Sequence, residues 1–137
     1  MRLSLVLFVC LVALTGCLKS DGKFEVKGTV TYDGQSVGDG MIVFMPLKGE
    51  PGGSESTDIK NGGFTVRLPE GKRTVQVFGY RPGPEIVSPT GGQPQSTKEQ
   101  FIPEAYNAKS ALSLNAVKGM APLLYELTKP EPNIPGK

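Results

Sequence analysis

Short alternating segments, separated by glycine and proline, most constrain what this chain can fold into. The chain holds 18 Gly and 12 Pro among 137 residues, so few stretches are long enough, and free enough of both residue types, to form helices. Apolar residues instead recur at every second position, which is typical of strands with one buried face. The sequence therefore predicts an all-β chain in which no helix is required.

Seven segments carry this alternation. The first begins at Lys23, places Phe24, Val26, Val30 and Tyr32 on one face, and ends at the turn signal Asp33-Gly34. The others, each bounded by Gly, Pro or Asn, are residues 41–45, 54–59, 64–68, 73–80, 110–117 and 123–127. Six or seven short strands of this kind predict an antiparallel β-sandwich. We expect its interior to contain Val30, Val43, Phe64, Val66, Val75, Val77, Leu112 and Leu114.

Residues 81–104 interrupt the pattern. They are rich in Pro and Gly and show no periodicity. A structureless connection of this length is unusual in a compact domain and is generally either functional or disordered. Because binding residues collect on loops held by a rigid scaffold, we expect function to reside here, with a passive insertion as the alternative.

The amino-terminal residues predict an export signal. Arg2 precedes an apolar run, residues 3–14, broken only by Ser4. The run is too short for an ordinary membrane span of about 20 residues but is typical of the core of a secretory signal. The closing tetrapeptide Leu14-Thr15-Gly16-Cys17 resembles the bacterial lipobox. The resemblance implies cleavage after Gly16 and a diacylglycerol on Cys17, often with a further acyl chain such as palmitate on the new amino terminus.

These expectations divide the chain into four parts. Residues 1–16 are a lipoprotein signal peptide, 17–22 a lipidated tether, 23–128 the β-sandwich domain and 129–137 a flexible Pro-rich tail. The expected partner at Cys17 is a membrane, because each buried CH₂ of an acyl chain contributes about 0.8 kcal/mol. Leu18 stands where Asp commonly signals inner-membrane retention in some bacteria, which favours the outer membrane.

Composition excludes several function classes. The chain has no His, which removes the usual general base, the usual zinc ligand and every nucleophile paired with His. Cys10 would leave with the signal and Cys17 would be acylated, so no free thiol and no disulfide is expected. The formal charge of +2 falls to +1 when the signal leaves, since that segment carries Arg2 and no acid. We expect no nucleic-acid partner and no cofactor.

Two blocks of sequence resemble a known family. FEVKGTVTYDGQSVGDGMIVFMP, residues 24–46, and STDIKNGGFTVRLPEGKRTVQVFGY, residues 56–80, are similar to transthyretin-like, carboxypeptidase-regulatory-type sandwich domains. FIPEAYNAKSALSLNAV, residues 101–117, resembles the late part of small bacterial lipoproteins with this fold. The resemblance implies a sandwich over most of the mature chain and implies little about activity. The enzymatic branch of the group uses histidines, which are absent here.

Candidate site residues each have a plainer interpretation. Tyr80, Phe101 and Tyr106 beside residues 81–104 could stack on a sugar or a peptide, or they could pin the returning chain onto the sandwich. Glu99 and Glu104 could form a glycosidase pair, but solvated charges explain them. Asp33, Asp39 and Asp58 could ligate calcium, but each is a single acid beside Gly or Thr, and turn chemistry explains them. No metal site is expected.

The sequence thus predicts a non-catalytic, lipid-anchored envelope lipoprotein with a sandwich module for structural or protein- or ligand-binding work. Besides the membrane, an envelope protein or a glycan is the expected partner. The alternative is a hydrolase-associated or carbohydrate-binding module at the cell surface. A cleft with converging carboxylates would favour the hydrolase, and coplanar exposed aromatic rings would favour the glycan.

Overall fold

A computed structural model describes residues 21–130, and this part of the chain is all-β. Its strands are β1 (Lys23–Tyr32), β2 (Gln35–Ser36), β3 (Asp39–Pro46), β4 (Glu55–Lys60), β5 (Gly63–Pro69), β6 (Gly71–Ile86), β7 (Gln95–Gln100), β8 (Ser113–Ala116) and β9 (Leu123–Leu127), with one 3₁₀ turn, η1 (Glu104–Tyr106). Within residues 21–130 there is no helix with the length and hydropathy to cross a membrane. The predictions for the signal peptide, Cys17 and the end of the tail lie outside the described residues.

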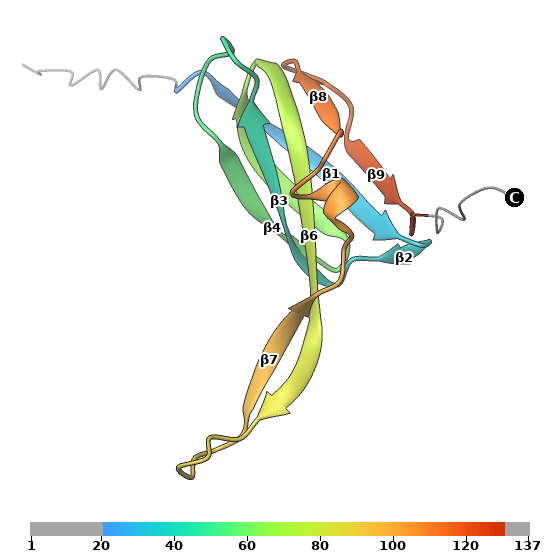
Figure 1. Cartoon of the computed structure of the whole chain (residues 1–137). Helices are drawn as coiled ribbons and strands as arrows, with labels where there is room; N and C mark the ends of the chain where they lie inside the picture. Colours follow the sequence, from blue (N-terminus) through green and yellow to red (C-terminus); the bar gives the residue numbers. More distant parts are fainter. Residues whose placement is uncertain (1–20, 131–137) are drawn as a thin grey trace, which may run out of the picture.

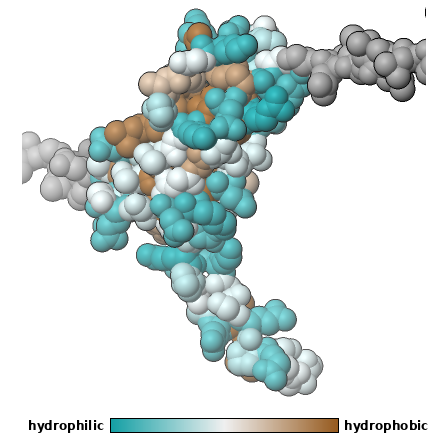
Figure 2. All heavy atoms as spheres, turned by 180° about the vertical axis from the view of Figure 1, so that it is seen from behind, coloured by the Kyte–Doolittle hydropathy of each residue, from teal (hydrophilic) through white to brown (hydrophobic). Residues whose placement is uncertain are grey.

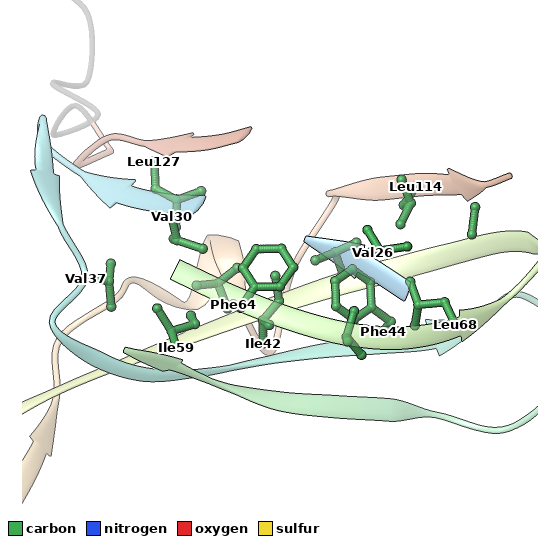
Figure 3. Close-up of a cluster of buried hydrophobic side chains, with 14 of the residues drawn as sticks. Val26, Val30, Val37, Ile42, Phe44, Ile59, Phe64, Leu68, Leu114 and Leu127 are labelled. Carbon is green, nitrogen blue, oxygen red and sulfur yellow. The ribbon is translucent and has the colours of Figure 1, made fainter. Parts of the chain in front are cut away.

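The strands form one connected sheet that curls on itself (Figure 1). Its order is β2-β1-β5-β4-β3-β6-β7, with β8 added to β6 and β9 to β1. β4 and β5 pair only at Lys60 and Gly63, where the hairpin turns. This narrow join lets β1 and β5 face β3 and β6 across the interior (Figure 3).

The expectation of a purely antiparallel arrangement is wrong for one strand pair. β9 runs parallel to β1, from Gly28 opposite Leu123 to Tyr32 opposite Leu127. The reason is the path of the chain, because β8 pairs with β6 and the next residues then cross to the far edge of β1. Every other strand pair is antiparallel.

The interior lies between the two facing halves of the curled sheet (Figure 3). Six of the expected core residues are buried there: Val30, Phe64, Val66, Val75, Val77 and Leu114. Leu112 is half-buried and packs against them. Val43 is a correction, because its neighbours Ile42 and Phe44 are fully buried and Val43 faces outward. Residues 41–45 are apolar on both faces, so their alternation could not indicate which face is inside.

The prediction of a structureless segment over residues 81–104 is also wrong. β6 continues to Ile86 and pairs with β7 in a hairpin, which we call the arm (residues 81–100). β3 follows β6 only as far as the pair Asp39 and Tyr80, so the arm projects from the rest of the sheet, here called the body (Figure 1). A bulge between Pro82 and Glu85 accommodates the prolines in this part of β6. These prolines interrupt the alternation of apolar and polar residues, so the sequence pattern did not indicate a strand.

Candidate functional site

The root of the arm, where it leaves the body, carries a hollow on each face. The larger one, which we call the waist hollow, has a volume of about 430 Å³ and is open to solvent. It is lined by residues from three separate parts of the chain: Tyr32, Asp33, Gln35, Arg81 and Phe101. Because the arm and the end of β1 meet here, a molecule in this hollow would contact both the body and the arm.

Two aromatic rings form the apolar part of the waist hollow. Tyr32 is the last residue of β1, and Phe101 directly follows β7. Their ring centroids lie 5.8 Å apart with the planes at 64°, an edge-to-face contact. The Arg81 guanidinium lies 5.9 Å from the centre of the Phe101 ring, within the range of a cation–π contact. The rings therefore do not form the flat platform expected for a glycan site.

An ion pair holds Arg81, the charged residue that the arm contributes to the waist hollow. The Nε and Nη2 atoms of Arg81 each donate a hydrogen bond of 3.1 Å to the Glu99 carboxylate. These bonds lower the pKa of Glu99 and raise the pKa of Arg81. Burial, followed by the nearby charge of Asp33, raises the pKa of the Tyr32 hydroxyl. Both partners of the pair remain more than half exposed, so the pair orients Arg81 and contributes little to stability.

The smaller hollow, which we call the Asp39 notch, lies against the other face of the arm root. It has a volume of about 220 Å³ and is lined by Asp39, Tyr80, Arg81, Pro82, Ser96, Thr97 and Lys98. Asp39 accepts hydrogen bonds from Lys60 and, at 2.6 Å, from Lys98. The two lysines, Lys60 first, lower the pKa of Asp39 to about 2. Lys98 belongs to β7, so this carboxylate ties the arm to β3 of the body.

The structure separates the three aromatic residues that sequence reasoning grouped as a binding site. Tyr80 lines the Asp39 notch and Phe101 lines the waist hollow. Tyr106 belongs to neither, because its hydroxyl donates to the Thr128 carbonyl oxygen at 2.9 Å and accepts from the Thr128 amide at 3.2 Å. The plainer interpretation, a residue that pins the returning chain, therefore describes Tyr106.

Sequence reasoning missed Tyr32 and Arg81. Tyr32 continues the alternation of Phe24, Val26 and Val30, which predicts a residue that faces the core. Arg81 lies in a segment with no periodicity. Only the pairing of β6 with β7, which places Arg81 opposite Glu99, brings these side chains together. No local signal in the sequence could have found this contact.

The carboxylates of the hydrolase alternative are each held by a separate cation. Glu99 is paired with Arg81, and Glu104 with Lys109 at 2.7 Å. Both glutamates have a lowered pKa, because in each case the cation donates a hydrogen bond to the carboxylate. A general acid needs the opposite shift.

The remaining acids do not form a metal site in the part of the chain that the structure describes. No group of three Asp, Glu, Cys or His side chains in residues 21–130 could hold a metal ion. Asp33 instead accepts a hydrogen bond of 2.7 Å from the Lys129 amide, and Asp39 is occupied by the two lysines.

Comparison with known proteins yields little. No protein-family model matches the chain, and no curated protein matches it. Among solved structures, the chain is similar to a 9R-lipoxygenase from Cyanothece PCC8801, with 12% sequence identity over 78% of this chain and a TM-score of 0.36. This chain spans 16% of the lipoxygenase chain, and a likeness this weak carries no argument about fold or function.

Proposed function

We propose that this protein is a non-catalytic lipoprotein, anchored through Cys17 to a membrane outside the cytoplasm, whose body presents the arm to a protein partner. The anchor rests on the sequence alone, namely the apolar run that ends in Leu14-Thr15-Gly16-Cys17. Leu18 after the lipidated Cys favours the outer membrane where one exists. The tether of residues 17–22 is then short, so the body works close to the lipid surface.

The proposal includes a transthyretin-like sandwich as the type of fold. Its support is the resemblance of residues 24–46 and 56–80 to that group, together with two facing halves of a curled sheet around one interior. The parallel strand β9 and the projecting arm are features of this chain that the proposal has to accommodate. In such a fold the body is a rigid carrier for whatever it displays.

The observation that carries the binding role is the arm itself. None of residues 81–100 is buried, and the hydrogen bond from Lys98 to Asp39 joins the root of the arm to the body. An isolated two-stranded hairpin is at best marginally stable in water. The arm is such a hairpin and does not pack against the body. It is therefore best suited to docking, since a partner would supply the missing contacts.

Several features of the described residues support a non-catalytic role. The glutamates considered for hydrolysis are each neutralised by their own cation. The waist hollow holds one carboxylate, Asp33, and its two rings lie at 64°. Neither the paired acids of a glycosidase nor the flat aromatic platform of a glycan-binding module is assembled there. A protein partner therefore fits the site better than a polysaccharide.

The anchor is tested by mass spectrometry of the mature amino terminus. We expect diacylglyceryl-Cys17, and we expect Cys17→Ser to leave an unprocessed precursor because the thioether requires sulfur. Cys10→Ser is the matched control, since that cysteine lies inside the signal and its loss should leave processing intact. A mature chain that begins elsewhere and is released without detergent would refute the anchor.

The binding role is tested by removing the arm. Residues 84–97 are replaced with a short Gly-Ser linker, which keeps Arg81, Glu99 and Lys98 in place. Partners that cross-link to the wild-type protein in intact envelopes should be lost. The control is Thr65→Ala on the exposed face of β5, which should leave them unchanged. If the arm replacement and Thr65→Ala cross-linked to the same partners, the arm would be a passive insertion.

A further inference from the structure

The two edges of the arm differ in what they offer to another strand. The β6 edge contains Pro82 and Pro84, and a bulge interrupts its register. Proline lacks the amide hydrogen that a neighbouring strand would need, and proteins use it to block exposed edges. β7 has no proline between Gln95 and Gln100 and pairs with no second strand in the described part of the chain. The β7 edge is therefore the one that is open for pairing.

The pattern of hydrogen bonds shows which β7 groups point outward. The Phe101 amide donates to the Gly79 carbonyl oxygen at 3.0 Å, so residue 101 points its backbone groups toward β6. Because these directions alternate along an antiparallel strand, residue 99 also points inward, and residues 96, 98 and 100 point outward. The free edge thus presents backbone donors and acceptors at Ser96, Lys98 and Gln100.

We propose that the partner of the arm is a second copy of this chain, which pairs its own β7 antiparallel to this edge across a two-fold axis at Thr97. The proposal rests on the arm being the binding element and adds the identity of the partner. It makes a four-stranded ribbon, β6-β7-β7-β6, from two marginal hairpins. Each hairpin then gains a third strand and the backbone hydrogen bonds that come with it.

Charge disfavours two alternative registers of this pairing. Centred on Thr97, residues 95–99 of one copy oppose residues 99–95 of the other, so Lys98 faces Ser96 and Glu99 faces Gln95. A register centred on Lys98 or on Glu99 would place like charges directly opposite each other, which is unfavourable. The Thr97 register also matches Ser96 with Lys98, two residues whose backbone groups point outward.

The shape of the molecule agrees with such a pairing. The arm stands clear of the body (Figure 1), and the view from behind shows it mostly hydrophilic along its length (Figure 2). In an antiparallel pair the tip of each arm lies near the root of the other. The tip carries the exposed apolar residues Ile86 and Val87, at 59% and 61% exposure, and the root carries the waist hollow with its two aromatic rings. The second copy thus brings an apolar tip toward the root, where Tyr32 and Phe101 line the waist hollow.

A single introduced cysteine tests the two-fold axis. Residues at the axis of a non-hydrogen-bonded pair have Cα atoms about 4.5 Å apart, within the range that a disulfide spans. Full-length Thr97→Cys in mild detergent should therefore form a covalent dimer under gentle oxidation, about tenfold or more faster than Thr65→Cys on the body. The unsubstituted chain, with Cys10 and Cys17 only, supplies the baseline.

A proline substitution tests the open edge without a new thiol. Ser96→Pro removes one outward amide donor, whereas Ser96→Ala removes only the hydroxyl and keeps the donor. Sedimentation of the full-length protein in detergent should show a concentration-dependent dimer for the wild type and Ser96→Ala, and a monomer for Ser96→Pro.

The outcomes separate this inference from the proposed function. Equal cross-linking of Thr97→Cys and Thr65→Cys, or a wild-type monomer at all concentrations, would overturn self-pairing. If arm replacement still removed an envelope partner in that case, the binding role would stand with a different protein as the partner. If the variant with the replaced arm kept both its envelope partners and its dimer, self-pairing and the binding role of the arm would both be overturned.

Discussion

The body and the arm share one strand, β6, and differ in what surrounds it. Residues 73–80 of β6 lie beside β3, and Val75 and Val77 on this stretch are fully buried. Residues 81–86 have only β7 as a neighbour, and none of them is buried. Backbone pairing alone therefore builds a hairpin but no interior. The body therefore holds the stability of this protein, and the arm remains free to gain contacts elsewhere.

The largest expected effect is the loss of a buried ring from the body. Phe64 is 6% exposed and stacks near Tyr125 with ring centroids 6.4 Å apart. Phe64→Ala should lower the free energy of unfolding, measured by urea denaturation, by about 3–5 kcal/mol. Thr65→Ala on the outer face, and Ile86→Ala in the arm, should each change it by less than about 0.5 kcal/mol. Similar small effects at all three positions would remove the distinction between body and arm.

Close backbone approach in the body should give the next largest effect. A Cβ atom on Gly40 of β3 would lie 2.3 Å from the Phe78 carbonyl oxygen of β6, whereas one on Gly38 would meet nothing within 4 Å. Gly40→Ala should therefore cost about 1–3 kcal/mol through displaced backbone, and Gly38→Ala should cost far less. Thermal denaturation of the two variants compares them directly. Equal melting temperatures would show that β3 and β6 are less tightly paired than described.

Acid should loosen the arm before the body. The pKa of Asp39 is lowered to about 2 by Lys60 and Lys98, below its usual value of 3.8. A carboxyl with a lowered pKa contributes stability above its unfolded pKa and loses it as pH falls toward the folded one. Amide protection factors at Thr97 and Glu99, whose amides point toward β6, should therefore fall between about pH 5 and pH 2, while those of β5 persist.

A substitution at Asp39 isolates this contribution. Glu99 acts in the same direction, since Arg81 lowers its pKa as well. Asp39→Asn should have low protection at the arm root already at pH 5 and a weaker dependence on pH. Protection that falls equally in the wild type and in Asp39→Asn would assign the effect to Glu99 instead.

The smallest expected effect on stability comes from removing the arm. Replacement of residues 84–97 with a Gly-Ser linker deletes no buried residue, so the free energy of unfolding should change by no more than about 0.5 kcal/mol. Urea denaturation of the same variant that loses its partners measures this. A loss of several kcal/mol would mean that the arm contributes to the folding of the body.

The sequence by itself determined the strands of the body and the turns between them. Alternation with a period of two is a local property, and it located β1, β3, β5 and the body part of β6. Turn chemistry is local as well. Asp33-Gly34 and Asn61-Gly62 all have positive φ values, 49° and 77° in the first turn and 50° and 81° in the second, as their residue types predict.

Tertiary structure decided the facing of β3, the direction of β9, the arm and the site at its root. Met41 to Met45 are apolar on both faces, so only pairing with β4 and β6 directs Ile42 and Phe44 inward. The prolines of the arm interrupt the alternating pattern by which a strand is recognised in sequence. The strand forms nevertheless, because a bulge accommodates the prolines and β7 pairs with β6. Contacts such as Arg81 with Glu99 join residues far apart in sequence. Such contacts exist only once distant strands have paired, and therefore no local pattern in the chain encodes them.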